Sequence, residues 1–315
     1  MSRWKLGTVP FKFQLSDWTL FSIPLSLQMR TEKLDSASGK SEADRVPVEE
    51  IEKNSRGFLI RGLPVPEELP AISRMDGFIR YVPHHYQHCY IDLGMSFEDY
   101  QQKFSSKTRS TIRRKIRKYS EHCKGDIPWK AYKTPEEIRE FIRLARSVSK
   151  LTYQERLLDA GIPDSEEFIS EAERLASEGR VRAYLLFDGE RPVSYLYCPV
   201  KDDTLIYAYL GYDPDYQQMS VGTILQWLAM EELFGENRFR YFDFTEGESD
   251  HKRLFATNQR QCANVFLLRK NVQNALIVYA HHAGNRFSEW LGRVFDRLGL
   301  KTRIRHFLRF GRQAE

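Results

Sequence analysis

Residues 205–252 constrain the fold of this chain more than any other stretch, because they predict a fixed order of elements. An apolar strand over residues 205–212 runs into the tight turn 213–216, and a helix follows the turn. A second strand, residues 240–244, then leads into the acidic loop 245–252. A strand that feeds a helix through a tight turn presents free backbone N–H groups at the positive end of the helix dipole. This stretch therefore predicts a site for a phosphate or pyrophosphate group.

The residues before this stretch predict an antiparallel hairpin. Two apolar runs, residues 181–188 and 192–200, are separated by the turn residues Gly189 and Glu190. With a further strand expected over residues 262–270, the order becomes β-β-β-α-β-α-β. The first three strands should form an antiparallel meander, and the helix should cross over to a strand parallel to the one before it. The expected fold class is α/β or α+β, with a mixed, mostly antiparallel sheet flanked by helices.

The rest of the chain gives shorter signals. Helices are expected to begin after the capping residues Ser96, Thr134 and Ser165. The end of the chain is expected to be a basic amphipathic helix, and the polar residues 31–56 to be a connection. Short strands are expected over residues 19–29, 57–60, 77–83, 88–93 and 129–132.

Composition favours a folded, enzyme-like body without a membrane span. Hydrophobic residues make up 41% of the chain and aromatic residues 13%, enough for a sizeable core. No apolar run is long enough to cross a bilayer, and the N-terminus lacks the features of a signal peptide. The four cysteines form no C-x-x-C pair, so free thiols and a cytoplasmic location are expected.

Positive charge is concentrated in one predicted helix within residues 103–120. The net charge of the chain is only +5, yet residues 103–118 contain eight lysines and arginines and no acid. Arg109, Arg113 and Arg117 are spaced to share one stripe of this helix. Such a stripe suits an anionic substrate or RNA, and its ordinary alternative is a solvated helix face.

Three sequence blocks resemble a known enzyme superfamily. Gln217, Ser220 and Gly222 have the spacing of the pyrophosphate loop Q/R-x-x-G-x-G/A of the GNAT acyl-CoA-dependent N-acyltransferases, with serine at the first glycine. The chain is more closely similar to the CelD-like, FemAB-like branch of that superfamily. The blocks that carry this resemblance are Ser106-Lys107-Thr108-Arg109 with Arg113-Arg114 and Arg117; Gly211-Tyr212-Asp213-Pro214-Asp215-Tyr216 with Ser220 and Gly222; and Asp243-Phe244 with Gly247 and Lys252.

The resemblance implies two GNAT-like halves, of which the first is degenerate. The expected domains are residues 1–145, including the basic helix, residues 146–270, which hold the acyltransferase centre, and the helical tail 271–315. The implied co-substrate is acetyl-CoA or another acyl-CoA, and no metal is expected.

The resemblance also assigns the carrier site. Backbone N–H groups of residues 219–222, including Val221 and Gly222, would bond the pyrophosphate together with Gln217 and Ser220. The acyl-CoA arm would add to the strand at Leu210 and Gly211 like an extra strand, with an N–H near Leu210 stabilising the oxyanion. The ordinary alternative is a turn in which Ser220 caps a helix.

The acidic loop and the strand before it supply candidates for the chemistry. An amine acceptor must lose a proton, so a carboxylate or histidine is needed as base. Glu246 and Asp243 are preferred to Glu248 and His251. Lys252 would bind substrate or carrier phosphate, or polarise a carbonyl. Most acidic loops are simply solvated, and that is the alternative for these residues.

Two further features are assigned ordinary roles. The cluster of His84, His85, His88 and Cys89 lacks the spacing of a metal site and is expected to be packed or exposed. The basic tail helix suits an anionic membrane surface, but packing on the body of the protein is preferred.

The leading hypothesis is therefore an N-acyltransferase, with acetyl as the expected acyl group. It would act on the primary amine of a small molecule, and the branch suggests an amino sugar in polysaccharide biosynthesis. One alternative is a FemAB-like aminoacyltransferase that uses aminoacyl-tRNA, which requires steeply salt-dependent tRNA binding. Another is a catalytically degenerate GNAT fold that only binds ligands. No DNA partner is expected.

Overall fold

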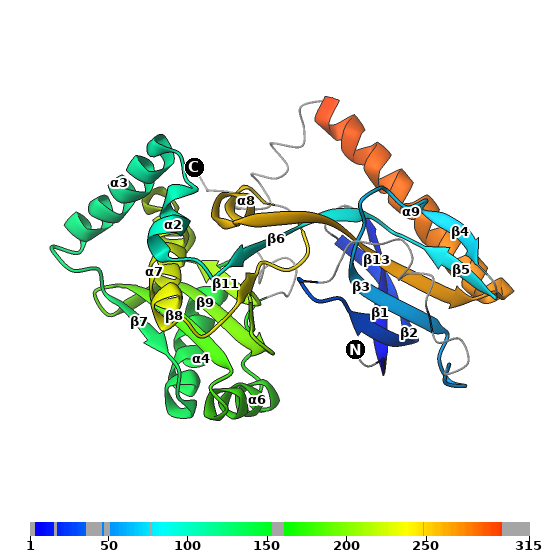
Figure 1. The fold of residues 1–315 in the computed structure, drawn as a ribbon, viewed down its shortest axis with the longest axis horizontal. Helices are drawn as coiled ribbons and strands as arrows, with labels where there is room; N and C mark the ends of the chain where they lie inside the picture. The colour runs from blue at the N-terminus through cyan, green and yellow to red at the C-terminus, as the bar shows by residue number, and fades with distance from the viewer. Residues whose placement is uncertain are drawn as a thin grey trace, which may run out of the picture. The chain divides into compact units, whose positions relative to one another are not determined.

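The computed structural model describes residues 4–15, 18–35, 46, 51–75, 77–152, 161–247 and 249–297, with side chains as far as residue 294. Contacts divide the chain into unit 1, Met1–His88 with Arg260–Glu315, and unit 2, Cys89–Gln259 (Figure 1). These boundaries differ from the predicted domains 1–145, 146–270 and 271–315. The basic helix falls in unit 2 because it packs against a helix of the later sequence.

The sheet of unit 2 has the predicted meander. β8 (Val181–Asp188) pairs antiparallel with β7 (Trp129–Tyr132) and with β9 (Arg191–Lys201). β9 pairs antiparallel with β10 (Thr204–Ile206), and β10 pairs parallel with β12 (Tyr241–Asp243). β12 is also antiparallel to the end of β6 (His85–Asp92). The predicted parallel crossover is confirmed.

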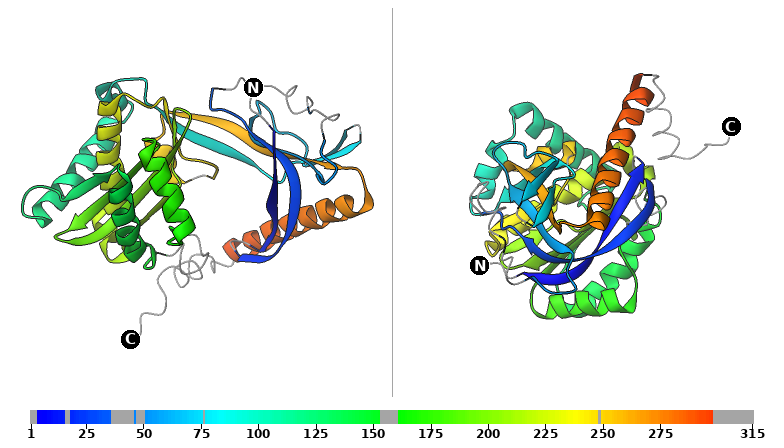
Figure 2. Two further views of the ribbon diagram at one scale, coloured as in Figure 1. Left: turned by 90° about the horizontal axis from the view of Figure 1, so that it is seen from below. Right: turned by 90° about the vertical axis from the view of Figure 1, so that its right-hand side faces the viewer.

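Helices cover both faces of this sheet, as Figures 1 and 2 show for the green and yellow part of the chain. Alternate residues of β8 explain the two layers, since Tyr184 and Leu186 enter one core while Ala183 and Leu185 enter the other. The first core is covered by α2 (Phe97–Gln102), α3 (Ser106–His122) and α7 (Val221–Glu236). The second is covered by α4 (Pro135–Ser149) and α6 (Glu166–Ser177). The predicted caps at Ser96, Thr134 and Ser165 are confirmed.

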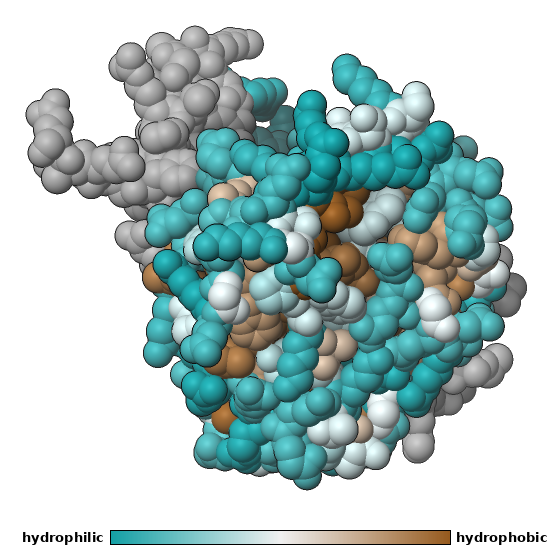
Figure 3. Space-filling view, turned by 90° about the vertical axis from the view of Figure 1, so that its left-hand side faces the viewer, coloured by the Kyte–Doolittle hydropathy of each residue, from teal (hydrophilic) through white to brown (hydrophobic). Residues whose placement is uncertain are grey.

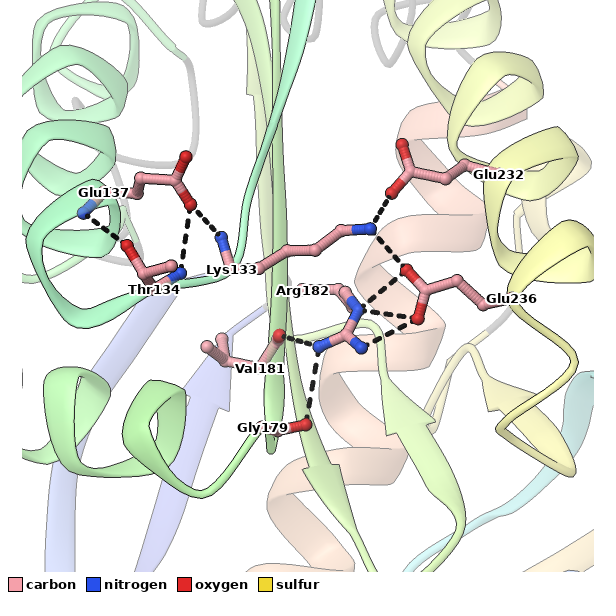
Figure 4. A network of polar contacts seen from close by, with 8 residues as sticks. All are labelled: Lys133, Thr134, Glu137, Gly179, Val181, Arg182, Glu232 and Glu236. Atoms are coloured by element: carbon pink, nitrogen blue, oxygen red, sulfur yellow. Dashed lines mark hydrogen bonds and ion pairs between the residues drawn. The ribbon is translucent and has the colours of Figure 1, made fainter.

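A nearly buried ion network ties the end of α7 to the sheet (Figure 4). Arg182 Nη2 lies 2.7 Å from Glu236 Oε2, and Arg182 Nε is 3.0 Å from both carboxylate oxygens. Lys133 Nζ lies 2.6 Å from Glu236 Oε1 and 2.5 Å from Glu232 Oε1. The network fixes the C-terminal half of α7, so the first turn of this helix has a rigid support.

Unit 1 contains the other strands of the sheet, mostly in antiparallel pairs, and one helix. Its strands are β1 (Lys5–Leu15), β2 (Trp18–Thr31), β3 (Gly57–Pro64), β4 (Ile72–Met75), β5 (Phe78–Tyr81) and β13 (Asn258–Arg269). Among the strand pairs described for unit 1, β2 and β3 pair in parallel, and the helix α9 (Val272–Arg297) packs against β1 and β5. The mixed, mostly antiparallel fold flanked by helices is thus confirmed.

The structure corrects several element boundaries. The strand predicted over residues 19–29 is longer, and its antiparallel partner β1 was not predicted. β4 was also missed, because four residues carry almost no periodic signal. Most important, residues 205–212 are not one strand, since β10 ends at Ile206 and β11 (Tyr209–Tyr212) begins after a break. Residues 298–315 of the predicted tail lie outside the described residues.

Candidate functional site

The break between β10 and β11 opens the sheet of unit 2. The N–H of Tyr207 still donates to the carbonyl oxygen of Asp243 on β12, at 2.9 Å. Beyond that bond β11 pairs with β9, from Tyr209 opposite Tyr197 to Tyr212 opposite Ser194, and no longer with β12 in the part of the chain described. A strand with one unpaired edge offers backbone donors and acceptors to a ligand. The side of β11 that faces away from β9 is therefore available for an added chain.

The turn after β11 leads into a helix whose first turn is uncapped. The 3₁₀ helix η2 (Pro214–Met219) ends at Ser220, which has left-handed backbone angles, φ 57° and ψ 36°. The Ser220 side chain makes no capping bond, and the first turn of α7 contains no acidic residue. The alternative prediction, that the Ser220 side chain caps the helix with a hydrogen bond, is therefore not observed. The N–H groups of this turn and the helix dipole are left without a negative partner from α7 itself.

Two glycines lie beside this turn, and the packing of the fold requires only one of them. A Cβ on Gly211 would lie 2.6 Å from a ring carbon of Tyr195 and 2.8 Å from Thr152, so the packing of the fold requires glycine there. A Cβ on Gly222 would meet only the Tyr212 ring, at an ordinary 3.6 Å. The fold itself therefore does not require a glycine at position 222, and the space beside it is open to a ligand.

A cavity of about 430 Å³ lies between β11, the start of α7 and the start of α8 (Asp250–Phe255). Its volume is in the range of small-molecule sites. All six residues predicted to bind the carrier line it, as does Lys252. These six are Leu210, Gly211, Gln217, Ser220, Val221 and Gly222.

The α8 side of the cavity carries two basic side chains. Burial, together with the positive charges of Lys115 and Lys252, lowers the pKa of His251 to about 4, so its imidazole is neutral at neutral pH. His251 Nε2 is buried and has no hydrogen-bond partner among the described residues. Lys252 Nζ donates to the carbonyl oxygen of Glu246 at 2.8 Å, and burial lowers the pKa of this lysine.

The predicted carboxylates lie beside the cavity rather than in its wall. Asp243 Oδ1 accepts a hydrogen bond from the N–H of Thr245 at 2.7 Å. Glu246 is exposed, and both carboxylates contribute to the electrostatic environment of Lys252. Neither is among the residues that line the cavity. Glu248 lies outside the described residues.

The predicted arginine stripe is present on α3, but the three arginines differ in their contacts and exposure. Arg109 Nη1 donates to the carbonyl oxygen of Phe104 at 2.8 Å, so this side chain supports the end of α2. Arg113 is exposed, and Arg117 pairs with Glu121 at 3.6 Å on the surface. None of the three arginines lines the cavity. Figure 3 shows the side of unit 2 on which α3 lies, where hydrophilic residues dominate and apolar residues are recessed between them.

The sequence did not point to several residues of this site, of which three bear on its chemistry. Gln226 lines the cavity from α7, and Tyr207 lines it at the break between the strands. Lys115 on α3 contributes its charge to His251. Only Gln226 leaves a sequence signal, as the one polar residue in the run ILQWLAM over residues 224–230.

The described residues are also without a metal-binding cluster or a membrane-spanning helix. Among the residues that the structure describes, no group of three or more histidine, cysteine or acidic side chains is placed to hold a metal ion. No helix in the described ranges has the length and apolar character needed to cross a bilayer.

Residues 106–253 match the family model of the acetyltransferase (GNAT) domain. Among solved structures, FemX is 10% identical, with 87% of this chain and 90% of that chain covered and a TM-score of 0.48. The C-terminal DUF2156 domain of a putative lysylphosphatidylglycerol synthetase from Agrobacterium fabrum is 10% identical, with 72% of each chain covered and a TM-score of 0.47. L-PGS from Bacillus licheniformis is 12% identical, with 72% and 73% covered and a TM-score of 0.44. No curated protein sequence matches the chain.

Proposed function

We propose, since residues 106–253 match the model of the acetyltransferase (GNAT) domain, that the chain transfers an acyl group from acyl-CoA to a primary amine. Acetyl is the simplest such group. One observation carries the proposal: the uncapped first turn of α7 and the unpaired edge of β11 face one cavity. A helix terminus of this kind suits the pyrophosphate of CoA, and a strand edge suits its extended arm.

The carrier would bind in two parts. The pyrophosphate would accept hydrogen bonds from the N–H groups of Val221 and Gly222, with Gln217 and Ser220 beside it. Gly222 supports this placement because nothing in the packing of the fold demands a glycine there. The arm would lie along Leu210 and Gly211, which brings the thioester toward Tyr207 and α8.

The chemistry would be a direct attack in a ternary complex. The neutral amine adds to the thioester carbonyl carbon, forming the C–N bond and a tetrahedral oxyanion. An N–H near Leu210 and the ammonium of Lys252 would stabilise that oxyanion. The nitrogen passes one proton to a base, the C–S bond breaks, and the CoA thiolate takes that proton from the base and leaves as the thiol.

His251 is the base that the cavity favours. It lines the cavity, and its neutral imidazole can accept a proton. Asp243 and Glu246 remain the carboxylate alternatives, acting through water from outside the cavity wall. Under this proposal a small amine, with an amino sugar of polysaccharide biosynthesis as one candidate, is the acceptor.

Calorimetry with acetyl-CoA and with free CoA tests the binding step. Micromolar binding that weakens at least tenfold in Gly222→Asp, with an unchanged melting temperature, is expected. No binding to the wild-type chain at millimolar ligand would refute the proposal. Release of CoA thiol with a panel of amines then tests turnover, and binding without any turnover would favour the degenerate GNAT module.

A second candidate function, aminoacyl transfer from aminoacyl-tRNA, is favoured by the exposed side of α3. Arg113, Arg114 and Lys118 are exposed there, with no ion pair to a described residue. Filter binding of bulk tRNA should distinguish the two. If tRNA is the partner, the logarithm of the binding constant should fall steeply with the logarithm of the salt concentration, and the double variant Arg113→Glu/Lys118→Glu should lose binding. Weak binding that is equal in the wild type and the double variant would exclude tRNA.

A further inference from the structure

Helix α9, orange in Figures 1 and 2, buries one face in unit 1 and exposes a row of apolar side chains on another. Asn274, Val278 and His281 form the buried face and are at most 8% exposed. Five large apolar side chains of the other face are 53–85% exposed, and they are Val272, Leu276, Tyr279, Phe287 and Trp290. Ala283, which is exposed, and Val294, which is half-buried, complete this apolar stripe.

The spacing of these residues makes the apolar stripe continuous. Steps of 4, 3, 4, 4, 3 and 4 residues lead from Val272 to Val294, which amounts to two 11-residue repeats that meet at Ala283. On a helix of 3.6 residues per turn the stripe is about 33 Å long and about 80° wide. Monomeric soluble proteins seldom expose a contiguous apolar surface of this extent, whereas interaction sites do.

The apolar stripe is symmetric about Ala283. The matching positions on either side are, from the ends inward, Val272 with Val294, Leu276 with Trp290, and Tyr279 with Phe287. Two antiparallel copies of α9 that cross at Ala283 therefore bring each large side chain to the level of a large apolar side chain of the other copy. The small side chain at the crossing lets the two helix axes approach closely.

The charges of α9 favour the same antiparallel arrangement. Residues 272–285 contain no lysine, arginine, aspartate or glutamate, and Arg286, Glu289 and Arg293 follow them. An antiparallel pair sets these three side chains against the uncharged half of the other copy and opposes the two helix dipoles. A parallel pair would instead set each arginine against its own equivalent.

The same charges disfavour an anionic bilayer as the occupant of the apolar stripe. Helices that lie on such a surface are rich in lysine and arginine along their polar face. Residues 272–285, which contribute half of the stripe, have neither. The first half of the stripe therefore offers apolar contact without electrostatic attraction, which suits a second copy of the chain.

We propose that the chain forms a two-fold symmetric homodimer through the apolar stripe of α9, with the two helices antiparallel and crossing at Ala283. Such an interface uses the same patch on both copies, so it closes on itself and association stops at two. It uses no residue that lines the acyl-CoA cavity of unit 2.

Sedimentation equilibrium of the full chain tests the association. We expect twice the chain mass of 37.1 kDa at micromolar concentration. Ala283→Arg places two cations at the crossing, so the dissociation constant of the dimer should rise at least about 100-fold. The matched control is Ser288→Arg, at an exposed position of α9 about 140° around the helix from Ala283, and it should associate like the wild type. Circular dichroism spectra identical to that of the wild type confirm that both variants fold.

Engineered cysteines test the orientation of the two helices. Oxidation of Ala283→Cys should give a covalent dimer, because the two new thiols meet at the crossing. Leu276→Cys alone should stay uncoupled, whereas its equal mixture with Trp290→Cys should form the covalent dimer. The wild type, whose four cysteines are buried or half-buried, is the control and should not couple.

Three results would overturn the proposal. A wild-type chain that stays monomeric up to its solubility limit has no such interface, and flotation of that monomer with vesicles of phosphatidylglycerol and phosphatidylcholine would assign the apolar stripe to a membrane. A dimer that Ala283→Arg does not weaken is formed by another surface. Efficient coupling of Leu276→Cys with itself would show a parallel pair. The cysteine variants decide the matter even if Ala283→Arg does not fold.

Discussion

Lys252 Nζ donates a hydrogen bond to the backbone carbonyl oxygen of Glu246, 2.8 Å away, and so closes the loop between β12 and α8. Lys252 also lines the cavity, and burial lowers its pKa, which marks it as a cation kept partly out of water. The bond holds the ammonium in a fixed position at the wall of the cavity, where the proposed mechanism needs a donor for an oxyanion.

Replacing Lys252 should separate catalysis from binding. Lys252→Met keeps the stem of the side chain but removes the charge and the hydrogen bond. We expect a fall in turnover of about 100-fold, typical for loss of one oxyanion donor, with free CoA affinity within about threefold of wild type. Thiol release and calorimetry measure the two quantities. Lys252→Arg should recover part of the turnover, and a variant with a large loss of CoA affinity would instead place Lys252 on a carrier phosphate.

The two glycines of the cavity should respond in opposite ways. Gly211→Ala forces a methyl group against Tyr195 and Thr152, so we expect a loss of about 1–3 kcal/mol in the free energy of unfolding. Gly222→Asp meets no such obstacle and places a negative charge at a helix N-terminus, which keeps or slightly raises stability while repelling a phosphate. Urea unfolding and CoA calorimetry on both variants test this contrast, and normal CoA binding by Gly222→Asp would contradict it.

Ser220 should tolerate glycine better than any branched residue. Its left-handed backbone, φ 57°, is strained for residues with a Cβ, and the side chain contributes no capping bond. We expect the free energy of unfolding of Ser220→Gly to be about 2 kcal/mol larger than that of Ser220→Val. The same pair of substitutions at Ser110, an exposed residue inside α3, is the control, where glycine should be the less stable. If the valine variant were the more stable one at both positions, the Ser220 backbone would not be strained.

Much of the fold was predictable because its signals are local. Thr134 begins α4 with a complete capping box, and the Gly189 turn joins two apolar runs, so neighbouring residues alone specify both elements. The parallel crossover followed from chain order, since a strand, helix and strand in sequence have few ways to pack. The six residues predicted to bind the carrier line one cavity because they come from the same short segment.

The remainder depends on contacts between distant residues. The apolar run of residues 205–212 is continuous, so nothing in it indicates that pairing with β12 stops after Tyr207. Lys115 and His251 are far apart in sequence, and only the packing of α3 brings the charge of one to the other. Gln226 shows the same limit, because a polar residue in an apolar helix does not reveal whether it has a partner.

The ion network at the end of α7 should show strong coupling. Arg182→Met leaves the carboxylate of Glu236 nearly buried with only Lys133 as partner, so we expect a loss of about 3 kcal/mol in the free energy of unfolding. Glu236→Leu should cost a similar amount, because it leaves the charge of the Arg182 guanidinium without a carboxylate partner. The double variant should recover much of the loss, and urea unfolding of all four proteins gives the coupling. Strict additivity of the two single losses would contradict the network.

The stability of the protein should depend on pH through His251. Its pKa is lowered from 6.5 to about 4, mainly by burial and also by Lys115 and Lys252. Between these pH values the unfolded chain binds a proton that the folded chain excludes, so the free energy of unfolding falls as the pH is lowered from 6.5 to 4. Above that window the group contributes no pH dependence, and below it the loss is complete, at roughly 3 kcal/mol.

The measurement is urea unfolding of wild type and His251→Gln at several pH values from 7.5 to about 4.5. Carboxylates titrate in both proteins, so the difference between them isolates the histidine. We expect the wild type to lose more stability than His251→Gln as the pH falls, with most of the gap opening below pH 6.5. Parallel curves would mean that the imidazole is protonated as easily in the folded chain as in the unfolded one. A His251 of ordinary pKa would then be charged at mildly acidic pH, and the proposed base would be active only above that range.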